Sequence, residues 1–324
     1  MPLFETGTKR IPSSLLHAKF GWPPFSILNT ISWDWQRRKD EWENIFKDST
    51  VGRDVKRYNA TPTNTFSARG ADAKQPESIS EFDPYLCELM YKWFSKPLDK
   101  ILDPFAGGCV RGVVAGVLNR HYYGVDLSAE QVYANQRQFD AIRKRWELPQ
   151  GWHTVHDDLR PAWFIDDALH FVSREKSNSK DMVFTCPPYY NLEKYTNDPR
   201  DLSNLPTYEA FLEKYTVILQ ECARVLKDDS FFVIVVSEIR ASNQEVKDSY
   251  YRGFVPDTIQ ILRDCCSLQY YNEIILENAI GSLPIRAPKY FDRFRKIGRH
   301  HQNILVFYKG DITHIEEKFG QVEI

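Results

Sequence analysis

The sequence predicts an α/β fold of the Rossmann-like, doubly wound class, and three observations support this prediction. From residue 83 onward, strand-like runs alternate with runs of helical periodicity, which is typical of a parallel sheet covered by helices on both faces. A pair of glycines separates the first of these strands from the helix that follows it, and an acidic residue follows the second strand. The 324 residues, of which 42% are hydrophobic, suffice for one large domain with appended segments or for two domains.

An N-terminal extension is expected over residues 1–80, ahead of the main domain at residues 81–324. The extension is rich in Pro, Trp and charged residues and is expected to be irregular, apart from a basic and aromatic helix over Ser32–Phe46. The Gly, Pro, Ser and Asn content of residues 60–80 predicts a loop. The main domain begins with Asp83 and Pro84, a favourable N-cap and first-turn pair, followed by apolar residues at helical spacing up to Phe94.

Seven strands and four further helices are expected after that first helix. The predicted strands are Lys100–Leu102, Tyr122–Val125, His153–Val155, Met182–Thr185, Phe231–Val236, Tyr271–Leu276 and Ile304–Tyr308. The predicted helices are Arg111–Leu118, Ala129–Arg145, Tyr208–Leu226 and Pro256–Cys266. Because ligands of such sheets bind beyond the carboxyl ends of the strands, functional residues are expected in the loops that follow the strands.

Composition excludes several classes of protein. The pI near 6.5 gives no overall basic character, so a nucleic-acid-binding protein of this charge needs a local basic patch. The six cysteines form no C-x-x-C pair and fit neither a zinc site nor the disulfide framework of a secreted protein, so no metal is expected. The N-terminus lacks the apolar core of a signal peptide, and no apolar run is as long as a membrane span. These features predict a cytoplasmic protein without membrane contact.

The loop after the first predicted strand is typical of a nucleoside site. It reads Asp103-Pro104-Phe105-Ala106-Gly107-Gly108-Cys109, and two glycines between a strand and a helix let a ligand approach the backbone closely. Asp126 follows the second strand, where a doubly wound fold places a carboxylate for ribose hydroxyls. The pattern is not G-x-G-x-x-G, and the acid that opens it suits an amino-acid nucleoside better than NAD. A tight turn with Ser128 as an N-cap is the alternative.

The loop after the fourth strand is expected to carry the chemistry. It reads Thr185-Cys186-Pro187-Pro188-Tyr189-Tyr190. Two consecutive prolines after a buried strand end its hydrogen-bond ladder and fix the backbone at the edge of the sheet, so that a neighbouring aromatic side chain projects over the cleft. The alternative is a proline-rich strand exit with two packing tyrosines.

These two loops resemble the motifs of amino-directed DNA methyltransferases, whose cofactor motif is DPFxGxG and whose catalytic motif is [Asp/Asn/Ser]-Pro-Pro-[Tyr/Phe/Trp]. The resemblance implies that the first loop binds the methionine part of S-adenosyl-L-methionine, that Asp126 holds the ribose, and that Asp158 or Asp157 meets the adenine amino group. It also implies that the last of the seven strands is antiparallel. The cofactor-binding residues expected on this basis are Phe82, Asp103, Pro104, Phe105, Gly107, Gly108, Asp126, Leu127, Asp157 and Asp158.

The catalytic residues that the resemblance implies are Cys186, Pro187, Pro188 and Tyr189. In the family, the first side chain of the motif and the first proline carbonyl accept hydrogen bonds from the target amine, and the aromatic ring stacks on the flipped base. An exocyclic amine is a poor nucleophile because its lone pair is delocalised into the ring. Acceptors directed at its N–H bonds stabilise the positive charge that develops as the methyl group arrives.

Cys186 departs from the family pattern, because a thiol is a weak acceptor compared with Asp or Asn. Either the Pro187 carbonyl supplies most of the contact, or Cys186 has another task such as packing. Pyrimidine C5 methyltransferases use a nucleophilic cysteine, but there the cysteine follows a proline, whereas Cys186 precedes two prolines. C5-cytosine methylation through Cys186 is therefore a less favoured alternative.

Outside the two motifs, the chain resembles phage- and prophage-encoded DNA modification methylases over most of its length. The similar segments are Pro24–Asn29, Trp35–Lys39, Leu192–Tyr195, Asp201–Ser203, Arg295–Lys296 and His301–Gly310. This resemblance implies a bacterial host cell and is compatible with a phage-encoded enzyme. The segment between the two motifs leaves no room for a separate recognition domain, so specificity is expected from the ends of the chain or from loops within the core.

The required basic patch lies in an insertion at about residues 280–301. Aromatic residues alternate there with cations, so the segment can neutralise phosphates while its rings contact bases. A solvated surface loop is the alternative. The expected DNA-binding residues are Arg286, Lys289, Arg293, Arg295, Lys296 and Arg299.

The function expected from the sequence is transfer of a methyl group from S-adenosyl-L-methionine to adenine N6 or cytosine N4 of a flipped base in double-stranded DNA. Two alternatives are an RNA amino-methyltransferase with the same loops and a DNA-binding protein of this fold that has lost turnover through the change at Cys186. The recognition sequence, a restriction partner and the oligomeric state do not follow from the sequence.

Overall fold

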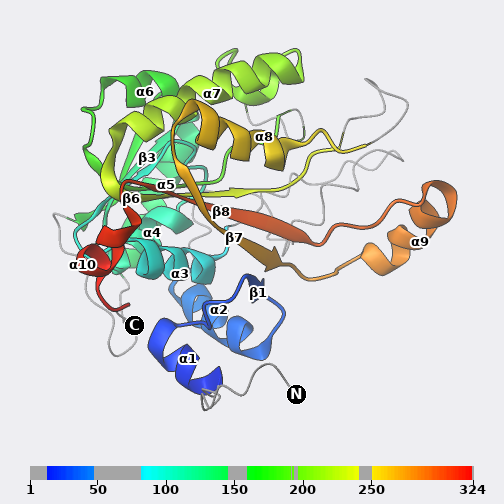
Figure 1. Ribbon diagram of the computed structural model, residues 1–324, viewed down its shortest axis with the longest axis horizontal. Helices are drawn as coiled ribbons and strands as arrows, with labels where there is room; N and C mark the ends of the chain where they lie inside the picture. The colour runs from blue at the N-terminus through cyan, green and yellow to red at the C-terminus, as the bar shows by residue number, and fades with distance from the viewer. Residues whose placement is uncertain are drawn as a thin grey trace, which may run out of the picture.

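The computed structural model describes residues 13–46, 82–144, 159–190, 192, 196–240 and 250–322, and its named strands form one mixed sheet with helices on both faces (Figure 1). The order across the sheet is β1-β7-β8-β6-β5-β2-β3-β4. The strands are β1 (Ile27–Asn29), β2 (Lys100–Asp103), β3 (His121–Asp126), β4 (Ala162–Ile165), β5 (Lys180–Thr185), β6 (Leu226–Val236), β7 (Gln269–Glu277) and β8 (His301–Lys309).

Neighbouring strands are parallel except around β8, which runs antiparallel to both β6 and β7. This confirms the doubly wound class and the antiparallel last strand. The expected number of seven strands is wrong, because the described residues form eight. β1 adds a strand at the edge of the sheet by pairing with β7, from Ile27 opposite Ile275 to Asn29 opposite Glu277. With only three residues, β1 is too short for a period-two pattern to be recognised.

The helices alternate with the strands as expected. They are α1 (Ser13–Phe20), α2 (Trp33–Phe46), α3 (Pro84–Phe94), α4 (Val110–Val117), α5 (Ala129–Lys144), α6 (Ala168–Arg174), α7 (Tyr208–Val225), α8 (Phe254–Gln260), α9 (Leu283–Phe294) and α10 (Ile315–Phe319). A π-helical turn, Ile261–Cys265, continues α8. Six of these helices were predicted; α1, α6, α9 and α10 were not. Within the described part of the chain, no helix is long and apolar enough to cross a membrane.

Side chains that alternate along the central strands fill two hydrophobic cores, one on each face of the sheet. Ile101, Met182 and Phe184 belong to the core that contains residues of α2, α3, α4 and α5. Leu102 and Val183 belong to the core that contains residues of α6, α7 and α8. Because both faces are covered, the strands are fixed in position and their carboxyl ends form a rigid edge.

The described part of the N-terminal extension is attached to the main domain through a buried carboxylate on α3. Glu88 accepts hydrogen bonds from the Arg38 guanidinium (2.7 and 2.9 Å) and from Trp42 Nε1 (2.7 Å), both on α2. Nζ of Lys92 lies 3.0 Å from the same carboxylate. Burial alone would raise the pKa of Glu88, but the contacts with Arg38, Lys92 and Trp42 lower it. The helix α2 is thereby fixed to α3, whose Tyr91 hydroxyl in turn donates to the Arg111 carbonyl of α4 (3.0 Å).

The strand beside β3 is β4, which the sequence does not predict. It pairs in parallel with β3, from Tyr123 opposite Ala162 to Asp126 opposite Ile165. The predicted strand His153–Val155 lies outside the described residues. The four residues of β4 read Ala-Trp-Phe-Ile and show no alternation of polar and apolar residues, which explains why the pattern does not reveal them.

Candidate active site

The two motif loops lie side by side at the centre of the sheet. β2 is flanked by β3 and β5, and the chain continues to β3 and β4 on one side and to β5 and β6 on the other. Ligands of doubly wound sheets bind at such a switch point, beyond the carboxyl ends of the strands. We call residues 103–109, which begin at the last residue of β2, the glycine loop, and residues 186–190, after β5, the proline loop.

The glycine loop bends across the end of β3 and leaves open space in front of its backbone. Gly107 has φ +52°, in the left-handed region, and a Cβ placed on it would meet no atom within 4 Å. The Gly107 amide donates to Asp126 Oδ2 (3.0 Å), and its carbonyl accepts from Nδ2 of the buried Asn135 on α5 (2.7 Å). The Ala106 amide donates to the Val125 carbonyl (2.9 Å). The loop is therefore held on its inner side while its outer side can receive a ligand.

Asp126, predicted to hold a ribose, is partly exposed beside the glycine loop. Its two oxygens accept the amides of Ser128 (2.8 Å) and Gly107, one each, and each oxygen can accept a further hydrogen bond. Burial raises the pKa of Asp126 to about 6, even though the two amides act in the opposite direction. The neighbouring Leu127 is also partly exposed. A carboxylate with free acceptor capacity at a strand end is suited to sugar hydroxyls.

Asp103, in contrast, is fully buried (0% exposed). Its Oδ1 accepts from Thr185 Oγ1 (2.7 Å) and the Phe105 amide (3.3 Å), and its Oδ2 accepts from Arg111 Nε (2.6 Å) and the Tyr122 hydroxyl (2.7 Å). The sequence alone gives no sign that Arg111, Tyr122 or Thr185 contacts Asp103. An arginine in the first turn of a helix is no motif by itself, and only the burial of Asp103 reveals the pairing.

The structure also describes four other predicted cofactor residues, two of them next to Asp103 in the chain. Pro104 is buried, and Phe105 packs against the core that contains α6, α7 and α8. The ring of Phe82 lies 4.5 Å from the guanidinium carbon of Arg111 and meets Phe184 of β5 edge-on at 5.8 Å. Gly108 is partly exposed at the start of α4.

The proline loop presents Tyr189 on a braced turn. Its ring meets Phe254 of α8 edge-on (centroids 5.8 Å apart), and its hydroxyl lies 3.8 Å from Cys186 Sγ and 3.3 Å from Nε2 of Gln302 on β8. Within the loop, Pro187 is buried and Pro188 is partly exposed. Cys186 therefore contacts the tyrosine expected to stack on a base, a contact that the motif does not predict.

Tyr190, which follows Tyr189, anchors the turn. It is 1% exposed and has φ +44°, a left-handed conformation that is strained for a residue with a large side chain. Its hydroxyl donates to the Pro206 carbonyl (3.3 Å), and its ring packs against Tyr208 and Phe211 of α7. This packing holds the backbone in the strained turn and so directs Tyr189.

Two acids follow β4 at the edge where Asp126 ends β3. The Asp166 amide donates to the Asp126 carbonyl (3.1 Å), and its carboxylate contacts His170 Nδ1 (2.8 Å) and Arg174 Nη2 (2.5 Å). Asp167 caps α6 through the His170 amide (3.1 Å). Asp157 and Asp158, predicted for the position after the third strand, lie outside the described residues. In the described sheet, Asp166 occupies that position.

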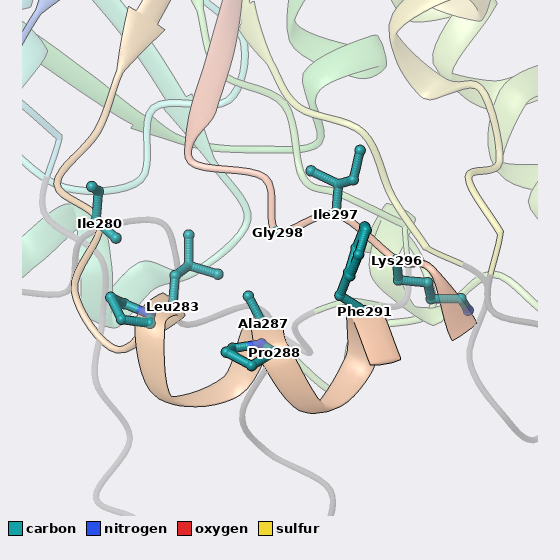
Figure 2. A pocket seen from close by; sticks show the side chains of 9 residues that line it. Ile280, Leu283, Ala287, Pro288, Phe291, Lys296, Ile297 and Gly298 are labelled. Atoms are coloured by element: carbon teal, nitrogen blue, oxygen red, sulfur yellow. The ribbon is translucent and has the colours of Figure 1, made fainter. Parts of the chain in front are cut away.

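The arm, residues 278–300 between β7 and β8, reaches away from the sheet and carries α9 at its far end (Figure 1). Leu283, Ala287 and Phe291, spaced one turn apart, face the returning chain at Ile297 and Gly298 and line an open apolar hollow with it (Figure 2). No residue of α9 is buried. The segment expected as a basic insertion is thus a helical hairpin arm.

All six predicted DNA-binding cations lie on this arm. Five of them belong to α9 or its C-terminal end, with Lys289, Arg293 and Arg295 exposed and Arg286 and Lys296 partly exposed. Helical spacing places Arg286, Lys289 and Arg293 on one face of α9, away from the apolar stripe. Two guanidinium groups lie over arm aromatics, that of Arg293 4.8 Å from the centroid of Phe294 and that of Arg295 5.3 Å from the centroid of Phe291.

Arg299 lies apart from the other five, at the base of the arm. Its Nε donates to Ser237 Oγ and to the His301 carbonyl (3.2 Å each), and its Nη2 donates to Asn303. These bonds tie the returning chain to the ends of β6 and β8. Among the described residues, no three His, Cys, Asp or Glu side chains converge in a way that could hold a metal ion.

Comparison with protein families gives one match. The family model N6_N4_Mtase, described as DNA methylase, matches residues 180–323. The matched segment begins with β5 and includes the proline loop and the arm, whereas the glycine loop precedes it. Among curated proteins, none matches this sequence.

Several solved structures match parts of this chain at low sequence identity. A candidate DNA modification methylase from Thermus thermophilus, complexed with S-adenosyl-L-methionine, is 23% identical over 45% of this chain and 51% of its own, with a TM-score of 0.34. This chain thus spans about half the length of that protein. A SAM-dependent methyltransferase from Methanosarcina mazei is 13% identical over 68% of this chain and 97% of its own, with a TM-score of 0.42.

Proposed function

We propose that this protein is a DNA methyltransferase that uses S-adenosyl-L-methionine to methylate an exocyclic amino group, adenine N6 or cytosine N4, of a base flipped out of the duplex. One observation carries the proposal. The segment matched by the DNA methylase family model begins at β5 and contains the proline loop, and the proline loop stands next to a glycine loop at the switch point of the sheet. A methyl donor and a methyl acceptor held by these two loops would meet at the edge of the sheet.

The cofactor would lie along the outer side of the glycine loop. The open space at Gly107 admits its amino-acid part, Gly108 and Phe105 flank it, and the free acceptor capacity of Asp126 suits its ribose. Asp166 is a candidate for contact with the adenine end, because it follows the strand next to Asp126. When bound, S-adenosyl-L-methionine supplies an electrophilic methyl group.

The target base would stack on Tyr189, with its amino group near the Pro187 carbonyl. A backbone carbonyl directed at an amine N–H stabilises the positive charge that develops on the nitrogen. Cys186 has a different task in this proposal, since its sulfur lies against the Tyr189 hydroxyl and helps to orient the ring. The departure from the family motif at Cys186 is therefore compatible with turnover.

Double-stranded DNA is the proposed partner of the arm. The basic face formed by Arg286, Lys289 and Arg293 would lie along phosphates, with Arg295 and Lys296 at the end of α9 adding to the charge. Only one acid, Asp292, lies among these cations. The bacterial, phage-related origin implied by the sequence belongs to the same proposal.

The direct test is incubation with labelled S-adenosyl-L-methionine and either duplex DNA or RNA, followed by mass spectrometry of the nucleosides. N6-methyladenine or N4-methylcytosine in DNA is the expected product. Label in RNA alone would identify an RNA methyltransferase, and duplex binding without any label would identify a silent DNA-binding protein. C5-methylcytosine would place the chemistry on Cys186 instead.

Variants of the proline loop separate the two possible roles of Cys186. Tyr189→Ala removes the stacking surface and should cost about 1–3 kcal/mol in transition-state stabilisation, as one base–aromatic stack does. Tyr189→Phe keeps the ring and loses only the hydroxyl contacts with Cys186 and Gln302, so it should lose less. Cys186→Ser should retain most of the turnover. An inactive Cys186→Ser variant, together with a covalent adduct on 5-fluorocytosine DNA, would show an attacking thiolate.

A further inference from the structure

A buried chain of polar side chains joins the glycine loop to the proline loop. At its centre is Asp103, whose two oxygens together accept four hydrogen bonds from within the protein. A carboxylate that is fully buried and bonded in this way cannot reach a ligand unless one of these bonds breaks first. Its contribution to a neighbouring site must therefore come through the groups that it holds.

On one side, Asp103 holds Arg111, and Arg111 holds the glycine loop. The guanidinium donates through Nη2 to the carbonyls of Phe105 (2.7 Å) and Ala106 (2.9 Å) while Nε donates to Asp103. Burial would lower the pKa of Arg111, but the nearby Asp103 carboxylate raises it, so the guanidinium stays charged. The Arg111 side chain thus fixes the turn that precedes Gly107, Gly108 and α4.

On the other side, Asp103 holds Thr185, the last residue of β5. Thr185 is 0% exposed, and its Oγ1 donates to Asp103 Oδ1 at 2.7 Å. The paired positions of β2 and β5 end at Leu102 opposite Val183, one residue before Asp103 and two residues before Thr185. The Thr185–Asp103 hydrogen bond therefore joins the two strand ends beyond their last pair, immediately before the proline loop begins.

We propose that Thr185 is a positioning residue that, through Asp103 and Arg111, sets the distance between the proline loop and the glycine loop. The inference rests on the proposed function, because the distance between the two loops matters most when one loop holds the methyl donor and the other holds the methyl acceptor. Transfer between two such loops needs the reacting atoms to be aligned, and a displacement of about 1 Å can reduce the rate roughly 100-fold. Thr185 touches neither partner in this scheme and acts only through the loops.

The first test needs neither cofactor nor DNA. Hydrogen exchange is measured by mass spectrometry on peptides that cover the proline loop in the wild type, Thr185→Val and Thr185→Ser. Valine has the same shape without the hydroxyl, so the Tyr189 and Tyr190 amides should exchange about tenfold faster, as expected for the loss of one buried hydrogen bond. Serine keeps the hydroxyl and should restore slow exchange. Thr216→Val, which removes a hydroxyl bonded to the Leu212 carbonyl on α7, is the matched control and should leave this loop unchanged.

The second test distinguishes the effect of Thr185 on turnover from the effect of Arg111 on cofactor binding. Thr185→Val should lower kcat about tenfold or more while the Kd for S-adenosyl-L-methionine changes by no more than about twofold, because Arg111 still holds the glycine loop. Arg111→Gln should instead weaken cofactor binding.

The proposal is overturned if exchange at Tyr189 and Tyr190 is the same in Thr185→Val and wild type. It is also overturned if exchange rises equally in every helix, because that would reflect general destabilisation. A wild-type protein that exchanges as expected but transfers no methyl group would defeat the proposed function and leave the positioning role of Thr185 supported.

Discussion

The glycine loop and the arm are both expected to bind charged or polar ligands, yet they are built in opposite ways. The acid that opens the glycine loop is fully buried, and four hydrogen bonds hold it. The arm has no buried residue on α9. Its exposed cations are Lys289 and Arg293 on α9 and Arg295 at the C-terminal cap of that helix. The charge of Asp103 is thus neutralised inside the protein, whereas the cations of the arm are exposed on the surface.

The difference indicates which substitutions should change the fold and which should change only binding. A buried charge that loses its partner is costly, because no water replaces the lost bonds. An exposed charge is already hydrated, so its removal leaves the fold almost unaffected.

The largest effect is expected at Asp103. Asp103→Ala leaves the Arg111 guanidinium buried without its carboxylate, and the free energy of unfolding should fall by about 3–5 kcal/mol. Asp292→Ala removes an exposed acid from the arm and should change it by no more than about 0.5 kcal/mol. Urea unfolding of both variants gives the two values. Equal losses of unfolding free energy in the two variants would contradict the contrast between a buried charge at the glycine loop and exposed charges on the arm.

A smaller effect, confined to ligand binding, is expected at Asp126. Asp126→Ala should weaken binding of S-adenosyl-L-methionine by about 1.5–3 kcal/mol, the value of a hydrogen bond to a charged group. Calorimetry of the purified protein measures this directly. Unchanged affinity would remove Asp126 from the cofactor site.

The same carboxylate should make cofactor binding depend on pH. Burial raises the pKa of Asp126 to about 6, so the acceptor is ionised above that pH and becomes protonated below it. If only the ionised form binds the ribose, affinity should be constant above pH 7 and about tenfold weaker at pH 5. Asp126→Asn cannot titrate and should bind weakly with a flat profile. A wild-type profile as flat as that of the variant would argue against an ionised Asp126 in the site.

Charge reversal on the arm is expected to have the smallest effect on the free energy of unfolding and a specific effect on DNA binding. Arg293→Glu with Arg295→Glu should leave the unfolding free energy nearly unchanged but should weaken duplex binding and reduce its salt dependence by about 0.9 per lost phosphate contact. The control reverses Lys176 and Arg263, two exposed cations that precede β5 and β7 at the opposite edge of the sheet. If the control reduces the salt dependence as much as the arm variant does, the arm is not the DNA-binding surface.

The sequence predicts the centre of this molecule better than its edges. Gly107, Asp126 and the two prolines are recognisable because each answers a local backbone or chemical requirement at the end of a strand. The partners of Asp103 were not predicted, because Arg111 and Thr185 meet it only once the sheet has formed. Sequence spacing alone cannot show such a contact.

The edges were missed for different reasons. β1 and β4 are short and gain their stability from pairing with a neighbour, so their own patterns are weak. In α9, Pro288 stands inside the helix, and proline in such a position normally argues against a helix. The assignment of Asp157 and Asp158 followed from a strand predicted just before them, whereas the described strand next to β3 is β4, ahead of Asp166.

The way the arm is joined to the sheet has a consequence for how the protein can change over generations. The chain leaves β7 and returns to β8 at neighbouring positions, where the Asn278 amide donates to the His300 carbonyl at 2.8 Å. Adjacent antiparallel strands can be connected by a turn of a few residues or by a long excursion without altering their register. The arm can therefore vary in length and sequence without a change in the pairing of β7 with β8. On the proposed function, exchange of the arm between related enzymes would alter which duplex is bound. The glycine loop and the proline loop at the edge of the sheet would stay the same.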